Sequence, residues 1–364
     1  MLLDVRKELL FRGKLWAQKK GIAPFFLRLV LHFVAFFWGM VSWIRNWGYD
    51  HRIFSVGKVD AFVVSIGNLV AGGTGKTPFT LLLAKKLLER GCRVGIISRG
   101  YGSSFGRAKR SVRITEEHWS AAGDEPCLLH KHLQNRAEVI VGDHRLSSAM
   151  MAVERGCRTL LLDDGMQARS FHRNLEITLL NARDLFGQGA FLPLGLLRER
   201  PEGLQRSDYI VLTHVKSLEH YREAKKRVEL FAQKPMIAAA HALSSIKNLQ
   251  GEEVAVKEGA CALFCGIANP HLFCELVEKS GCSIVHSLFL PDHGFLSHEE
   301  LLSFANMAKE KGASYILCTE KDGIKLDAET RFPLPVYYAE LQLQFIDGKE
   351  IFEQMVEQIV LSCR

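Results

Sequence analysis

The chain has 364 residues, 48% of them hydrophobic and 24% charged, which is an ordinary globular balance and enough length for two domains. The formal net charge is +7, and the first 60 residues contain ten Lys and Arg against four Asp and Glu, an excess of six. Because the remainder is nearly neutral, we expect no nucleic-acid groove across the body and no nucleic-acid partner. Nine cysteines without disulfide-scaffold spacing indicate buried thiols in a reducing cytosol.

The first element in chain order is an apolar segment from Pro24 to Ile44. Its tryptophans and the basic residues on either side are typical of a membrane interface. Arg28 and His32 interrupt it, so its uninterrupted part is shorter than the roughly 20 residues that a comfortable span needs. We therefore predict a helix embedded in or lying on the membrane, with a full span and a buried core helix as alternatives. Since the sequence shows no second span, we expect a body in the cytoplasm, held peripherally or by this N-terminal anchor.

Strand-like and helix-like segments alternate after a linker at 48–58. Strands are predicted at 62–66, 94–97, 138–141, 159–162, 176–180 and 209–212, and helices at 78–90, 126–133 and 145–154. Such alternation is typical of a parallel sheet with helices on both faces. A second α/β pattern follows, with strands at 261–265, 283–288 and 315–319, a helix at 270–279, and another opened by a capping box of Ser297 and Glu300.

The run SIGNLVAGGTGKTP, from Ser65 to Pro78, follows a hydrophobic strand and opens a helix, which is the context of a P-loop. Its glycines let backbone N–H groups wrap phosphates, and the helix N-terminus adds its dipole. Lys76 can reach the β- and γ-phosphates, and the Thr77 hydroxyl can bind Mg²⁺. The strict pattern has a glycine in place of Val70. We predict that ATP is held by Val70, Ala71, Gly72, Gly73, Thr74, Gly75, Lys76 and Thr77.

Two acids, Asp163 and Asp164, follow the predicted strand at 159–162 and precede Gly165. A P-loop needs an acid at the end of a neighbouring strand for Mg²⁺ or its waters, so we predict a metal site of Thr77, Asp163 and Asp164. The alternative is a plain Asp-Gly turn. Together these features predict an α/β protein with a P-loop NTPase parallel-sheet core, a second, smaller α/β domain and an N-terminal membrane-associated helix. The predicted boundaries are 1–57 for the helical segment, 58–235 for the core and 236–364 for the smaller domain.

Five further residues each have a functional and a structural interpretation. Asp124 is either a helix N-cap or a base that accepts a hydroxyl proton. Arg99 and Tyr101 follow a strand, and they either face an anionic substrate or form a surface turn. Arg198 either stabilises transferring phosphoryl charge or is solvated. His293, in a turn of the second domain, is either exposed or closes over the active site.

The chain resembles the tetraacyldisaccharide 4'-kinase family of lipid A biosynthesis. The matching runs are SIGNLVAGGTGKTPFT, ISRGYG, GDEP, GDHR, LLLDDGMQ, LPLGLLRE, GIANPHLF, PDHGFLS and TEKD. The resemblance implies transfer of phosphate from ATP to the 4'-hydroxyl of tetraacyldisaccharide 1-phosphate, a lipid substrate at the membrane surface, to form lipid IVA. It also implies Mg²⁺ and no obligate protein partner. Departures from the family pattern are Met166, Ala168, the run at 193–197 and Gly294.

The resemblance also assigns roles to individual residues. Catalytic roles fall to Lys76, Asp124, Asp163, Asp164, Arg198 and His293, with Asp124 as general base and His293 as the partner that tunes its pKa. The residues expected to line the substrate site are Asn68, Arg99, Tyr101, Gln167 and Glu199.

Two other functions are consistent with a P-loop. A membrane-recruited GTPase switch needs a guanine-reading [NT]-K-x-D motif, but in the run Thr319–Asp322 the Lys stands one place too late. A non-catalytic nucleotide-binding or scaffold protein is disfavoured by the retained Lys76, Thr77 and acid pair.

Overall fold

The computed structural model describes residues 22–100, 111–115, 122–255, 259–291, 294, 296–326 and 331–363, with side chains from residue 26 onward. The chain forms two compact units. Unit 1 comprises Met1–Ala239 and Phe345–Arg364, and unit 2 comprises Ala240–Gln344. The predicted site residues His293 and Tyr101 lie outside the described residues.

Unit 1 contains a sheet that is parallel except at one edge. Its strands, in spatial order, are β8 (Met236–Asn248), β7 (Tyr209–Thr213), β6 (Leu175–Asn181), β1 (Phe62–Asn68), β5 (Thr159–Asp163), β2 (Val94–Ser98), β4 (Glu138–Val141) and β3 (Val112–Arg113). Within the described residues, β3 pairs antiparallel with β4, and the other neighbouring pairs from β8 to β4 are parallel. The central strands are buried on both faces, as their continuous apolar runs predict.

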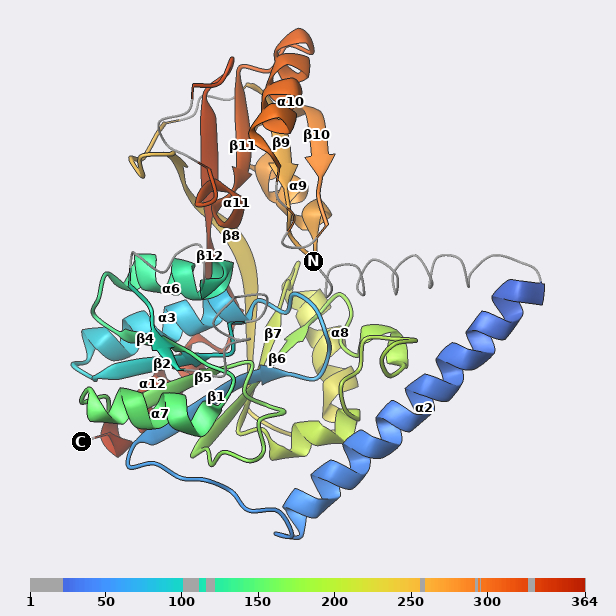
Figure 1. Cartoon of the computed structure of the whole chain (residues 1–364), viewed down its shortest axis with the longest axis vertical. Helices are drawn as coiled ribbons and strands as arrows, with labels where there is room; N and C mark the ends of the chain where they lie inside the picture. The colour runs from blue at the N-terminus through green and yellow to red at the C-terminus, as the bar shows by residue number, and fades with distance from the viewer. Residues whose placement is uncertain are drawn as a thin grey trace. The chain divides into compact units, whose positions relative to one another are not determined.

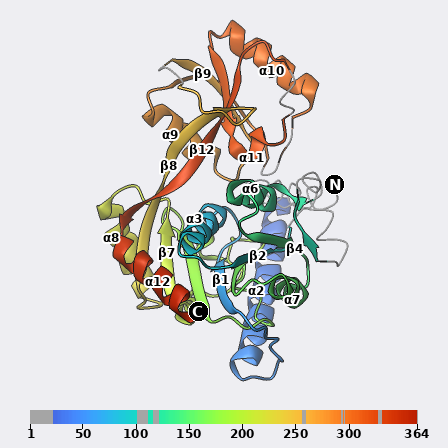
Figure 2. The ribbon, with the colours of Figure 1, turned by 90° about the vertical axis from the view of Figure 1, so that its left-hand side faces the viewer.

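Helices cover both faces of this sheet (Figure 2). α3 (Lys76–Glu89) and α6 (Asp124–Leu133) lie on one face, and α7 (Arg145–Glu154) lies on the other. Ala149 and Ala152 of α7 pack against Ile97 and Ile140 of the sheet. The remaining elements of this part are α8 (Leu218–Glu229) and two short 3₁₀ helices, η2 (Gly187–Gly189) and η3 (Pro201–Arg206). Each predicted strand and helix of the core is present, with ends shifted by one or two residues.

The last helix, α12 (Lys349–Ser362), belongs to unit 1 and not to the smaller unit. It packs on α3, where the rings of Phe79 and Phe352, both fully buried, lie 6.1 Å apart. Arg90 after α3 also pairs with Glu357 at 2.9 Å. The predicted smaller domain included everything from 236 to 364, whereas this apolar contact places the chain's last segment with the core.

Unit 2 has its own α/β arrangement. Its strands, in spatial order, are β10 (Ser283–Phe289), β9 (Ala260–Cys265), β11 (Tyr315–Thr319), β12 (Val336–Asp347) and β8. Its helices are α9 (Pro270–Lys279), α10 (His298–Glu310) and α11 (Glu320–Gly323). α9 packs through Phe273 on one face of this sheet and α10 through Phe304 on the other. The predicted capping box of Ser297 and Glu300 opens α10.

The N-terminal helix α2 (Ile22–Asp50) runs beside the core, and its N-terminal half extends away from it (Figure 1). It continues through the start of the predicted linker. Within the described part of the chain it is the one helix that is long and apolar enough to cross a membrane. Phe33 and Phe36 are 64% and 65% exposed, so α2 is not the buried core helix that was one alternative.

Candidate active site

The topology brings the P-loop and the acid pair to one edge of the sheet. β1 and β5 are parallel neighbours, and Ile66 lies opposite Asp163 in their register. The P-loop leaves the carboxyl end of β1, and the two acids follow the carboxyl end of β5. Ligand sites in open α/β sheets form at this edge, so the sequence-predicted phosphate and metal residues lie together.

The P-loop is fixed from two sides. The Asn68 Nδ2 donates to Thr74 Oγ1 at 3.0 Å, and Thr213 Oγ1 donates to the Thr74 carbonyl at 2.9 Å. The Ala71 N–H donates to the Leu196 carbonyl at 2.7 Å. Gly72, with a φ of 121°, has open space where a side chain would point. A φ in this region favours glycine, and the open side leaves room for phosphate oxygens.

Asp164 is held between two cations. The Arg198 Nη1 donates to both its carboxylate oxygens, at 2.7 and 2.8 Å, and Lys76 Nζ lies 3.5 Å from Oδ1. Burial alone would raise the pKa of Asp164, but the charges of Lys76 and Arg198 outweigh it and lower the pKa to about 2. Asp164 is therefore ionised at neutral pH, and it keeps both cations beside the P-loop.

Asp163 has different surroundings from its neighbour. Its Oδ2 accepts from Ser98 Oγ at 3.3 Å, while its buried Oδ1 has no hydrogen-bond partner among the described residues. Burial raises the pKa of Asp163 to about 6, and the charge of Glu125 adds to this effect. An ionised carboxylate oxygen left without a donor in a buried position favours a cation as its missing partner.

Arg145, to which the sequence patterns assigned no role, supports the edge of the sheet where the acids lie. Its buried guanidinium donates to the carbonyls of Ile97 at 2.9 Å and Asp163 at 2.6 Å. Burial lowers its pKa to about 10, so it remains charged. The guanidinium therefore joins the ends of β2 and β5. The only sequence signal for a role of Arg145 was its place in the run GDHR, immediately after a predicted strand.

Gln167 and Glu199 connect Arg198 to the P-loop. The Gln167 Nε2 donates to the Asn68 carbonyl at 2.9 Å and to Glu199 Oε1 at 2.8 Å, and its Oε1 accepts from Arg198 at 3.1 Å. Arg206 donates to the other oxygen of Glu199. Asn68 and Glu199 are 0% and 1% exposed. These three predicted substrate residues therefore have partners inside the protein.

The remaining predicted residues lie around this centre. Asp124 is the first residue of α6, and the N-cap is Gly123, so Asp124 is not the N-cap that was one alternative. The charge of Glu125, the next residue of α6, contributes to raising the pKa of Asp163. Arg99 is exposed and follows β2, and its charge contributes to lowering the pKa of Arg145.

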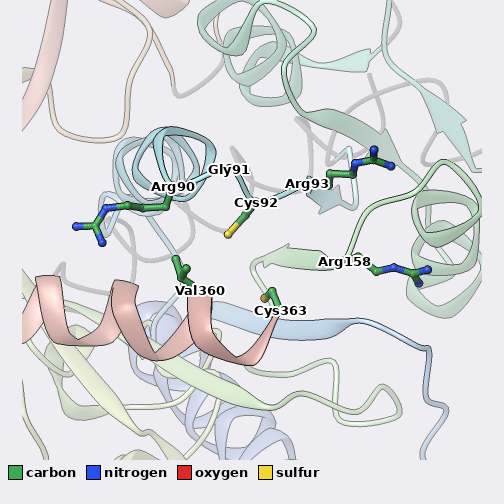
Figure 3. A pocket seen from close by; sticks show the side chains of 7 residues that line it. All are labelled: Arg90, Gly91, Cys92, Arg93, Arg158, Val360 and Cys363. Carbon is green, nitrogen blue, oxygen red and sulfur yellow. The ribbon is translucent and has the colours of Figure 1, made fainter.

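A separate cavity of about 140 Å³ lies at the other end of α3 (Figure 3). It is lined by Arg90, Gly91, Cys92, Arg93, Arg158, Val360 and Cys363. Since α3 has 14 residues and rises about 1.5 Å per residue, the cavity lies about 20 Å from Lys76. It is therefore not the phosphate site.

Comparison with known proteins identifies the family. A family model described as LpxK, tetraacyldisaccharide-1-P 4'-kinase, matches residues 27–360. The chain belongs to the tetraacyldisaccharide 4'-kinase family. It is 35% identical to the tetraacyldisaccharide 4'-kinase of Geobacter sulfurreducens over 335 residues, covering 90% of this chain and 92% of the relative. It is 32% identical to that of Chlamydia abortus over 338 residues, covering 88% and 90%.

A solved member of the tetraacyldisaccharide 4'-kinase family has the same fold. The crystal structure of LpxK from Aquifex aeolicus in complex with ATP aligns with a TM-score of 0.72 at 29% identity, covering 92% of this chain and 99% of that one. The chain is a kinase of this family with a P-loop α/β fold, as predicted. The ATP complex of the relative supports ATP as the nucleotide, and the GTPase and scaffold alternatives are not favoured.

Proposed function

We propose that the protein transfers the γ-phosphate of ATP to the 4'-hydroxyl of tetraacyldisaccharide 1-phosphate and so forms lipid IVA. The observation that carries this proposal is the cluster of Lys76, Asp164 and Arg198 beside a P-loop, in a chain of this family. In the reaction, the hydroxyl oxygen bonds to the γ-phosphorus while the bond from that phosphorus to the β–γ bridging oxygen breaks, and ADP leaves.

Lys76 and Arg198 supply positive charge where the phosphoryl group moves. Their side chains are 13% and 24% exposed, so solvent screens them only partly. Asp164 orients both cations and does not protonate at neutral pH, because they lower its pKa to about 2. Oriented charge of this kind needs no rearrangement as the transition state forms, which is how phosphoryl transfer is accelerated.

The residues around Asp163 fit a divalent cation. The Oδ1 of Asp163 is buried without a hydrogen-bond partner among the described residues, and Thr77 is in the first turn of α3. Hard oxygen ligands of this type suit Mg²⁺, whose chemistry when bound is to neutralise charge on phosphate oxygens. Of the two acids, we assign Asp163 to the metal and Asp164 to the cations, because the oxygens of Asp164 already have partners.

Asp124 is the proposed general base, which takes the proton of the 4'-hydroxyl. It begins α6, whose next residue, Glu125, is close enough to Asp163 to raise its pKa. The proposed partner of Asp124 is His293, and Arg99 and Tyr101 are proposed to face the anionic substrate. Asn68, Gln167 and Glu199 are proposed to act on the substrate site through Arg198, since their polar atoms bond within the protein.

We assign α2 to the inner membrane, with the catalytic body in the cytoplasm. Its outer face presents large apolar side chains, among them Phe33, Phe36 and Val41. Exposed apolar surface of this extent indicates a membrane or protein partner, and the tryptophans of α2 favour the lipid interface. An enzyme held there meets its acylated substrate in the lipid phase.

The direct test is incubation of the full chain with tetraacyldisaccharide 1-phosphate, ATP and Mg²⁺ in mixed micelles. We expect a lipid product heavier by one phosphate, together with ADP, detected by mass spectrometry. GTP in place of ATP tests the nucleotide. Absence of the phosphorylated lipid in the presence of bound ATP, or a strong preference for GTP, would overturn the proposal.

A further inference from the structure

The membrane helix α2 makes hydrogen bonds to the segment that carries Arg198. Trp38 Nε1 and Ser42 Oγ both donate to the main-chain carbonyl of Arg198, each at 3.1 Å. One turn further along α2, Asn46 Nδ2 donates to Glu199 Oε2 at 2.9 Å. Residues at positions 38, 42 and 46 lie on one face of a helix. One side of α2 is therefore bonded to two adjacent residues at the active site.

The backbone of Arg198 is held on its other side by the root of the P-loop. Its N–H donates to the Leu69 carbonyl at 2.8 Å, and Val70 pairs with Leu197 as an antiparallel bridge. The main chain of Arg198 thus lies between the P-loop and α2, and its side chain reaches Asp164. A shift of α2 would move the anchor point of the guanidinium.

The contact between α2 and the core is closely packed. At Gly39, an added Cβ would lie 2.5 Å from the ring of Phe191, so the ring sits directly against the helix backbone. Arg169 donates to the Asn46 carbonyl at 3.1 Å and to Asp50 at 2.7 Å. Ser42 is 8% exposed, while the adjacent Val41 is 61% exposed. The two faces of α2 therefore have separate roles, one toward the core and one toward the surroundings.

The network continues from α2 to the catalytic lysine without a gap. Asn46 bonds to Glu199, Glu199 accepts from Gln167, and Gln167 accepts from Arg198. Arg198 binds Asp164, which lies beside Lys76. Every link is a hydrogen bond or ion pair between described side chains.

We propose that Ser42 and Asn46 are positioning residues for phosphoryl transfer, through which the membrane helix holds Arg198 in its place at the active site. The inference rests on the proposed role of Arg198. Ser42 shares the Arg198 carbonyl with Trp38, and Asn46 shares Glu199 Oε2 with Arg206, so the polar groups of α2 add to the bonds that fix this pair. Displacement of a charged group by about 1 Å reduces turnover by up to about 10²-fold. A helix that only anchors the enzyme to lipid has no need of polar groups aimed at this pair.

The experiment compares Ser42→Ala, Asn46→Ala and the double variant as full chains in mixed micelles. We measure kcat, the KM for lipid, the KM for ATP and the partition into vesicles. The double variant is expected to lose about 10-fold or more in kcat, with both KM values within about 2-fold and unchanged partition. Wild-type kcat, or a change only in lipid KM or partition, would show that α2 is an anchor and nothing more.

Matched controls separate positioning from a general loss of stability. Ser42→Thr keeps the hydroxyl and is expected to restore kcat relative to Ser42→Ala. Ser362→Ala removes an exposed helical hydroxyl that donates to the Gln358 carbonyl in α12, and it is expected to leave kcat unchanged. Thermal melting is recorded for each variant, and a fall in kcat that tracks only the melting temperature in every variant, Ser362→Ala included, would contradict the proposal.

A double-mutant cycle with Arg198→Lys tests the route. If α2 acts through Arg198, the Ser42 and Asn46 substitutions cost much less in the Arg198→Lys background than in the wild type. If the α2 substitutions reduce kcat by the same factor in the Arg198→Lys background as in the wild type, α2 does not act through Arg198 and the proposed route is wrong. Full activity in Arg198→Ala would instead refute the role of Arg198 itself, so the two failures are distinguishable.

Discussion

The phosphate loop at 70–77 and the segment at 196–199 face each other at the active site, but they are built in different ways. The loop depends on its own residue types: glycines at positive φ, a lysine and a threonine opening a helix. The segment has no regular secondary structure, and it depends on donors from α2, the turn after β5 and the P-loop itself. In the proposed function, the first region therefore acts through its own groups on the phosphates, and the second acts by holding Arg198 in place.

The largest effect is expected at Lys76. Lys76→Ala removes the loop's own charge from the phosphates and from Asp164, and turnover should fall about 10³-fold or more. The fold should survive, since the side chain belongs to no apolar cluster. Steady-state kinetics and thermal melting check this, with Lys86→Ala at the far end of α3 as the matched control. Near-normal turnover in Lys76→Ala would show that the P-loop does not hold the phosphates of the nucleotide during the reaction.

The two adjacent acids should respond differently to the same change. Both Asp163→Asn and Asp164→Asn are expected to lower kcat about 10²-fold. Only Asp163→Asn should also raise the Mg²⁺ concentration needed for half-maximal activity, by about 10-fold, because its buried oxygen has no other partner among the described residues. A Mg²⁺ titration of each variant decides this. A raised Mg²⁺ requirement in Asp164→Asn but not in Asp163→Asn would instead assign Asp164 to the metal and Asp163 to the cations.

Asp124→Asn separates chemistry from helix capping. The side-chain shape is retained and the N-cap is Gly123, so the stability of α6 should be unchanged. Loss of a general base should lower kcat about 10²-fold. Turnover and thermal melting are measured together. An Asn variant with wild-type turnover would show that Asp124 takes no proton.

The smallest loss of turnover is expected in the supporting segment. Glu199→Gln removes a buried charge that faces Arg206, and we expect the free energy of unfolding to fall by about 2 kcal/mol. Turnover should fall about 10-fold, because Arg198 loses part of its support. Urea denaturation and kinetics check both, with the exposed Glu202→Gln as a control that should change neither. A loss of stability in Glu199→Gln without any loss of turnover would show that Glu199 stabilises the fold but does not support catalysis.

Much of the core could be predicted because its signals are local. Each strand is a short apolar run, and the rule that parallel strands end at one edge placed Asp163 and Asp164 beside the P-loop. Arg145 could not be found in this way, since its guanidinium binds carbonyls 48 and 18 positions away. The polar residues of α2 were also missed, because Ser42 has meaning only once its distant partner is known.

The domain boundary shows the same limit. Residues 336–362 have the strand and helix pattern of an ordinary C-terminal domain, and nothing local shows that α12 packs on α3.

Asp124 was ambiguous for a different reason. Capping and catalysis both favour an acid at the start of a helix, and only the backbone at Gly123 excludes the cap.

The packing of α12 on α3 has a consequence for how the protein is made. The ribosome releases α3 before unit 2 and α12 after it. Until α12 emerges, Phe79 lacks Phe352 and α3 keeps an uncovered apolar face. Exposed faces of this kind are sites of misassembly in chains that fold as they are synthesised. The core is therefore completed only after unit 2 has been made, and a chain that stops before α12 leaves this face of α3 uncovered.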